Sequence, residues 1–62
     1  MNMIQITKWL NPDDEIWYNG VYITTREWLM IEKERLSKLT NKRVVIRTDS
    51  DGAKAIFRER IK

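Results

Sequence analysis

Residues 16–23 read IWYNGVYI, an Asn-Gly pair between two short runs that are almost entirely apolar. Asn and Gly both tolerate the positive φ that a type I′ turn requires, so the pair predicts a tight hairpin with strands at 15–18 and 21–24. A two-residue connection also determines which residues lie opposite each other and share a face. One face should carry Ile16, Tyr18, Val21 and Ile23, and the other Glu15, Trp17, Tyr22 and Thr24.

A helix should begin directly after this hairpin. Thr24, followed three residues later by Glu27, is a capping-box pattern, and Ile23 before the cap can pack against Trp28. The helix should run from about residue 25 to about residue 40, where Asn41 can adopt the left-handed C-cap conformation. Because Ile23 then faces the helix, the opposite face of the hairpin should point away from it.

The N-terminal segment also has a strand pattern. Residues 3–10, MIQITKWL, begin with an alternation that directs Ile4 and Ile6 to one side and, if continued, Trp9 to the other. The following NPDD predicts a turn, because Asn favours its first position and Pro fixes φ at the second. We therefore expect the first three strands to form a meander.

RVVIRTD and AKAIFRERI flank DSDG at residues 49–52 and predict a second hairpin with a longer loop. Sorting the two strands by alternation gives one face that is a good core: Val44, Ile46, Ala55 and Phe57, with Ile61 in phase. The other face is strongly basic: Arg43, Val45, Arg47, Lys54, Ile56, Arg58 and Arg60. The apolar set is expected to face the helix.

These elements predict one α+β domain over residues 1–62, in the order β-β-β-α-β-β. A single helix should pack on one face of a small, mainly antiparallel sheet of four to five strands. Because one helix covers only one face of such a sheet, the other face should remain open. If both hairpins share the sheet, the open face gathers aromatic and basic side chains: Trp9, Trp17, Tyr22, Arg43, Arg47, Lys54, Arg58 and Arg60.

This open face suggests a binding function. Basic side chains neutralise phosphates and aromatic rings stack on bases, so our leading interpretation is non-enzymatic binding of DNA or RNA. No recognised nucleic-acid motif accompanies the pattern. One alternative is a protein-interaction module, either a small regulator or inhibitor of a larger protein or a homodimer subunit, with the same aromatics as anchors. Another is structural: the sheet curls and the aromatics complete one core.

Charge is unevenly distributed along the chain. Residues 1–41 contain five Lys and Arg against six Asp and Glu, whereas residues 42–62 contain seven against three. The basic C-terminal third favours an anionic partner.

Composition excludes several other functions. The chain has no Cys and no His, which removes the usual zinc ligands, disulfides and nucleophile-base pairs. We therefore expect no enzyme, cofactor, metal site or small-molecule substrate. DSDG resembles the start of a calcium loop, but Arg60 occupies the position of its bidentate glutamate. Glu32 falls within the apolar arc of the helix, and we expect it to pair with Arg35 or a hairpin arginine. The lack of a long apolar run or signal-peptide pattern predicts a cytoplasmic protein without a membrane partner.

YITTREWL, a strand that runs into a capped helix, resembles the opening of winged-helix excisionase-type proteins. That fold implies a second, recognition helix before the wing. Here the chain passes from Asn41 almost directly into the RVVIR strand, which leaves no room for such a helix. We therefore expect no winged helix and assign no residue a role from this resemblance.

Overall fold

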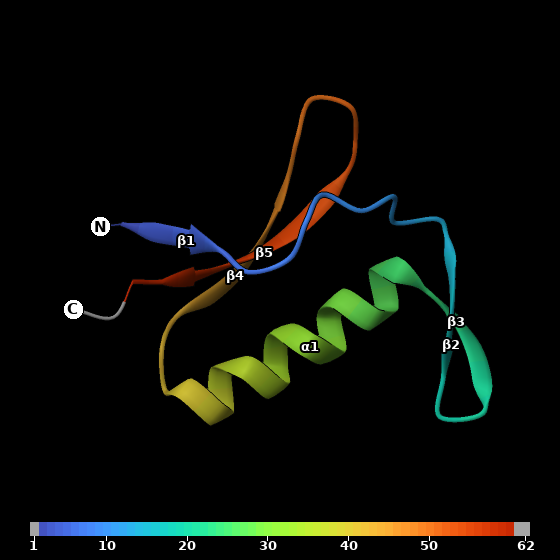
Figure 1. Ribbon diagram of the computed structural model, residues 1–62, viewed down its shortest axis with the longest axis horizontal. Helices are drawn as coiled ribbons and strands as arrows, with labels where there is room; N and C mark the ends of the chain where they lie inside the picture. The colour runs from blue at the N-terminus through green and yellow to red at the C-terminus, as the bar shows by residue number, and fades with distance from the viewer. Residues whose placement is uncertain (1, 61–62) are drawn as a thin grey trace.

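The computed structural model describes residues 2–60. Within these residues the chain forms one helix and five strands: β1 (Met3–Gln5), β2 (Glu15–Tyr18), β3 (Val21–Thr24), α1 (Thr25–Thr40), β4 (Val44–Thr48) and β5 (Lys54–Glu59). All strand pairs are antiparallel, and α1 packs against strands of both hairpins (Figure 1). The predicted α+β class, element order and packing of a single helix on antiparallel strands are confirmed. Ile61, predicted to lie in phase with the core, falls outside the described residues.

The first hairpin and the helix have the predicted bounds. Asn19 and Gly20 both have positive φ, 49° and 88°, as a type I′ turn requires. Thr24 is the N-cap of α1, and Asn41 ends the helix in the left-handed conformation with φ 55°. In the capping box, the backbone N–H of Glu27 donates to Thr24 Oγ1 at 3.2 Å, and the backbone N–H of Thr24 donates to Glu27 Oε1 at 3.0 Å.

Replacement of Thr24 by alanine tests this cap. Loss of the hydroxyl removes the acceptor for the Glu27 amide, so we expect the free energy of unfolding to fall by about 0.5–2 kcal/mol. Ser37→Ala is the matched control, because Ser37 is an exposed residue in the body of the helix. Urea unfolding followed by circular dichroism measures both. Equal losses in the two variants would contradict the assigned cap.

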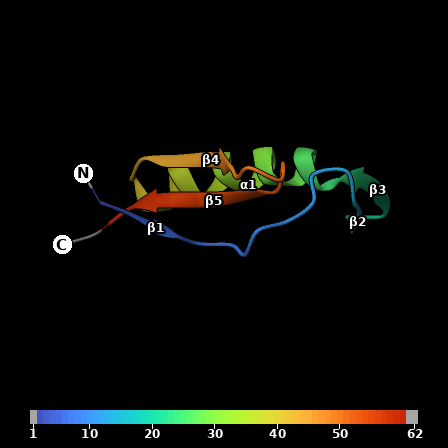
Figure 2. The same ribbon diagram turned by 90° about the horizontal axis from the view of Figure 1, so that it is seen from above.

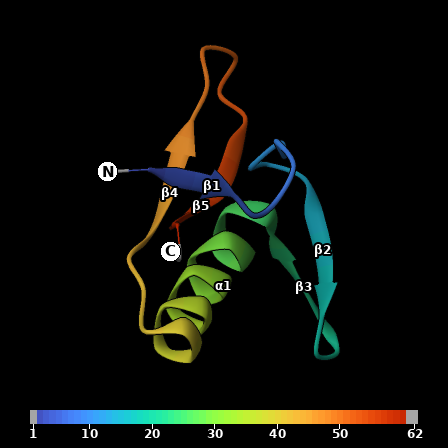
Figure 3. The same ribbon diagram turned by 60° about the vertical axis from the view of Figure 1, so that its left-hand side comes forward.

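The five described strands divide into two sheets rather than one. The main sheet has the order β1-β5-β4, and β2 and β3 form a separate hairpin. Figure 3 shows α1 between the main sheet and this hairpin, and Figure 2 shows the strands of the main sheet in the order β4, β5, β1. Within residues 2–60, neither β2 nor β3 contacts a strand of the main sheet.

The meander prediction was therefore wrong, because β1 pairs with β5 instead of β2. The chain continues along β5 beyond β1: the Ile6 N–H donates to Ile56 O, and Leu10 and Lys54 exchange two backbone hydrogen bonds, all at 2.8 Å. This pairing occupies the second edge of β5 and adds a third strand to a hairpin that would be only marginally stable alone. Ile6, expected to face inward, is 40% exposed.

The faces of the β4–β5 hairpin are also corrected. Ile46 lies opposite Ile56, and Thr48 opposite Lys54, so the loop consists of the five residues 49–53. Assigning residues to faces by alternation around a four-residue DSDG loop shifts the register of β5 by one residue. A one-residue shift moves every side chain of the strand to the other face. Ile56 is fully buried in the core, whereas Phe57, predicted to be in the core, lies on the opposite face.

The core lies between α1 and the main sheet. Leu29, Val44 and Ile56 form its buried centre, and it is surrounded by partly buried side chains: Leu10, Trp28, Leu36 and Ile46. The molecule is flat, with principal extents of 37 × 28 × 12 Å. A single layer of helix on sheet thus leaves the far face of the main sheet without a covering helix or second sheet among residues 2–60.

The turn before β2 holds the small hairpin to the helix. Thr25 is 3% exposed, and its backbone N–H and its hydroxyl both donate to Asp14 O, at 2.7 and 3.0 Å. The N–H of Arg26 donates to Pro12 O at 3.0 Å. These bonds satisfy backbone donors in the first turn of α1, which have no partner inside a helix.

Candidate nucleic-acid interface

The uncovered face of the main sheet is the best candidate site. We define the outer face by Met3, Trp9, Arg43, Val45, Arg47 and Phe57. Val45 lies opposite Phe57 in the β4–β5 pair, and Met3 lies opposite Glu59 in the β1–β5 pair, so Met3, Val45, Phe57 and the acidic Glu59 share the side away from Ile56. A shallow depression of about 220 Å³ on this face is lined by Met3, Arg43, Val45 and Arg47.

A cation and two aromatic rings are packed together on the outer face. The Arg47 guanidinium carbon lies 4.8 Å from the centroid of the Phe57 ring, and the rings of Trp9 and Phe57 have centroids 5.7 Å apart at 56°. Stacking on an aromatic face limits the conformations open to a guanidinium. Trp9 remains 41% exposed. The arrangement presents an indole surface beside an oriented positive charge.

Sequence reasoning placed Trp9, Arg43 and Arg47 in the site, and the structure brings these three to one face. It missed Phe57, which the shifted register had assigned to the core. The signal that could have found it is Asp49: its side chain accepts from the Asp51 and Ala53 amides at 2.9 and 2.8 Å, which closes a loop of five residues instead of four.

The other predicted basic residues do not join the outer face. Lys54 and Arg58 lie opposite Thr48 and Val44, on the side of the sheet that packs against α1. Lys54 Nζ donates to Thr48 Oγ1 at 2.7 Å, and Arg58 Nε is buried without a hydrogen-bond partner among the described residues. Arg60 follows the end of β5 and is exposed.

Trp17 and Tyr22 lie on the separate hairpin. They are 62% and 67% exposed, and their rings form an edge-to-face pair with centroids 4.9 Å apart. Because α1 lies between this hairpin and the main sheet (Figure 3), the expected single surface of Trp17, Tyr22 and the arginines does not exist. The predicted residues are thus divided among the outer face, this hairpin and the side of the main sheet that packs against α1.

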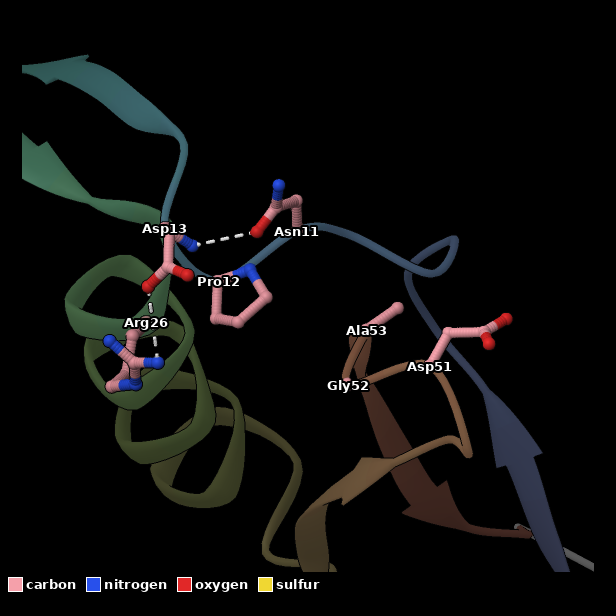
Figure 4. A pocket seen from close by; sticks show the side chains of 7 residues that line it. All are labelled: Asn11, Pro12, Asp13, Arg26, Asp51, Gly52 and Ala53. Carbon is pink, nitrogen blue, oxygen red and sulfur yellow. Dashed lines mark hydrogen bonds and ion pairs between the residues drawn. The ribbon is translucent and has the colours of Figure 1, made fainter.

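A second hollow lies between the NPDD turn and the DSDG loop (Figure 4). Its lining is mostly polar: Asn11, Pro12, Asp13, Arg26, Asp51, Gly52 and Ala53. Arg26 Nη2 pairs with Asp13 Oδ1 at 3.3 Å, so the cation that lines this hollow is balanced locally. These seven residues include no aromatic ring, and the hollow is a weaker candidate than the outer face.

Among the described carboxylates, Asp13 pairs with Arg26 and Glu32 pairs with Arg35. Among residues 2–60, no group of three His, Cys, Asp or Glu side chains is placed to hold a metal ion. Arg35 donates to Glu32 Oε1 through Nη2 at 2.6 Å and Nε at 3.2 Å, as predicted for Glu32. The hydrogen bond and the charge of Glu32 raise the pKa of Arg35 above its ordinary value.

Comparison with known proteins gives no relative: no family model, no curated protein and no solved structure matches the chain. Within the described residues, no helix has the length and apolar character needed to cross a membrane. The chemistry of the two exposed surfaces is therefore the basis on which a function can be assigned.

Proposed function

We propose that the protein binds single-stranded nucleic acid through the outer face. Arg43 and Arg47 contact phosphates, and Trp9 stacks on a base. The observation that carries the proposal is the packing of Arg47 on Phe57 beside the half-exposed indole of Trp9. A sheet face with aromatic rings and flanking positive charge is the arrangement by which several domains bind single strands.

A single strand fits this face better than a duplex. Stacking on Trp9 requires a base whose face is free, and the bases of a duplex are already stacked on each other. Of the predicted cations, only Arg43 and Arg47 belong to the outer face. Two phosphate contacts on a single strand correspond to a slope of about −1.4 in log K against log salt. We therefore expect weak binding with a shallow salt dependence.

Fluorescence anisotropy with labelled single- and double-stranded oligonucleotides tests the proposal across a range of salt concentrations. Arg47→Gln should flatten the salt slope by about 0.7, because one phosphate contact is lost. Lys38→Gln is the matched control: it removes the same charge from an exposed position on α1. Equal slopes in the two variants, or no binding of any oligonucleotide at low salt, would refute the proposal.

The stacking contact has its own matched pair of variants. Trp9→Ala should weaken single-strand binding by roughly 5- to 150-fold, the equivalent of ~1–3 kcal/mol per stacked base. Trp17→Ala removes an equally large and more exposed indole from the other surface, and should leave binding unchanged. Trp9→Phe should retain most of the affinity. An equal effect of the two alanine variants would place the contact elsewhere.

A further inference from the structure

The outer edge of β2 is open for pairing. Figure 3 shows β3 between α1 and β2, and among the described elements β2 contacts only β3 and α1. In a hairpin with a two-residue turn, Tyr18 and Val21 form a hydrogen-bonded pair and Trp17 and Tyr22 do not. The backbone N–H and C=O of Trp17 therefore point away from β3, toward the free edge.

The other strand edges carry features that oppose pairing. β1 has only three residues, and beyond Ile6 its regular pairing with β5 is interrupted. Along β4, Arg43 and Arg47 place positive charge beside the edge. On β3, the Thr24 N–H is already bonded to Glu27 in the capping box. β2 has none of these features between Ile16 and Tyr18, and residues 16–25 contain no charged side chain.

We propose that this edge is a self-association site, at which β2 pairs antiparallel with β2 of a second copy of the chain. Trp17 lies opposite Trp17 of the second copy, so the exposed groups of both edges bond to each other. The product is a four-stranded sheet in the order β3-β2-β2-β3, and three or more strands are much more stable than an isolated hairpin.

Charge favours a second copy as the occupant. In this register Ile16 faces Tyr18, and Glu15 faces Asn19, so no like charges are opposed. The equivalent pairing of β4 with itself would place Arg43 opposite Arg47. In a chain of net charge +3, residues 16–25, which carry no charge, form the surface on which two copies meet with the least repulsion.

The aromatic side chains support the same arrangement. Because Trp17 and Tyr22 share a face and their rings lie 4.9 Å apart, pairing through Trp17 joins the two aromatic pairs into one row across the four strands. Cross-strand aromatic contacts stabilise antiparallel sheets. The proposal thus accounts for two largely exposed rings, Trp17 at 62% and Tyr22 at 67%, that have no role in the outer face.

Analytical ultracentrifugation without nucleic acid tests self-association independently of the proposed function. We expect a monomer–dimer equilibrium between about 10 μM and about 1 mM, the affinity range of a small interface. A mass that stays monomeric throughout this range would overturn the proposal. A mass that rises with concentration supports the proposal only if Trp17→Lys weakens dimerisation more than Tyr22→Lys does.

Trp17→Lys and Tyr22→Lys distinguish edge pairing from packing of the aromatic faces. Each removes one exposed ring and adds one charge. In the paired edge, the two ammonium groups introduced at position 17 would lie opposite each other, and dimerisation should weaken by at least about tenfold. Two charges at position 22 would be separated by three strand spacings of about 4.8 Å each, or about 14 Å, which exceeds the screening length of ~10 Å. Tyr22→Lys should therefore weaken dimerisation by less than about threefold. Equal losses would overturn the edge model.

Amide hydrogen exchange of the unmodified protein gives a second test that needs no variant. The Trp17 N–H should exchange more slowly as protein concentration rises, because it becomes bonded to the second copy. The Tyr22 N–H, which points to the opposite edge of the hairpin, should not change. Equal exchange of Trp17 at low and high concentration would contradict the proposal even if the lysine variants fail to fold.

Discussion

Replacement of Leu29 by alanine is expected to remove most of the stability of the fold. Leu29 is fully buried and contacts the core between α1 and the main sheet. Buried Leu→Ala substitutions cost about 2.7–5 kcal/mol, the transfer energy of the lost atoms plus that of the cavity. A domain of 62 residues has a total of roughly 3–9 kcal/mol. The loss is therefore a large part of the total, and the urea midpoint of unfolding should fall sharply.

Leu39→Ala is the control for this prediction. It makes the same chemical change on the same helix, but Leu39 is 69% exposed, so the cost should be below about 0.5 kcal/mol. Urea unfolding followed by circular dichroism gives both free energies from the loss of the helix signal. A small effect of Leu29→Ala, comparable to that of Leu39→Ala, would mean that the core is not centred where the structure places it.

The parts of the fold that the sequence predicted well depend on contacts between near neighbours. The bounds of the first hairpin follow from Asn19 and Gly20, and the start of α1 follows from Thr24 and Glu27. In each case the determining hydrogen bonds or dihedral angles lie within a few residues, so the local sequence contains the information. The same is true of the Glu32–Arg35 pair, which is one helical turn apart.

The parts that could not be predicted depend on distant contacts or on a single position in a loop. Pairing of β1 with β5 joins Met3 to Glu59, and no local pattern distinguishes it from pairing with β2. In the second hairpin, the Ala53 N–H donates to the Asp49 side chain, so Ala53 belongs to the loop and not to β5. Each β5 residue therefore lies on the face opposite to the one that alternation around DSDG predicts. For both reasons the predicted single surface of aromatic and basic side chains does not form, although Trp9, Arg43 and Arg47 remain on one face.

The lysine variant of Ile56 tests the corrected register and is expected to prevent folding. Ile56 is fully buried in one cluster with Leu29 and Val44. A lysine there would have to bury its ammonium group, leave it neutral, or push the helix from the sheet, and each alternative costs several kcal/mol. We expect a loss of more than about 4 kcal/mol, which is comparable to the whole stability of a domain of this size.

Val45→Lys makes the comparison decisive, because alternation around a four-residue loop assigns Val45 and Ile56 to the same face. In the structure Val45 lies on the outer face, where its side chain is only half-buried, between Arg43 and Arg47. A lysine at this position can keep its charge in water, so the free energy of unfolding should fall by no more than about 1 kcal/mol. It also adds a third cation to the proposed phosphate-binding surface, and the salt slope for a single strand should steepen by about 0.7. If Ile56→Lys folds as well as Val45→Lys, the two residues share a face as the four-residue loop implies, and the outer face is not the one described.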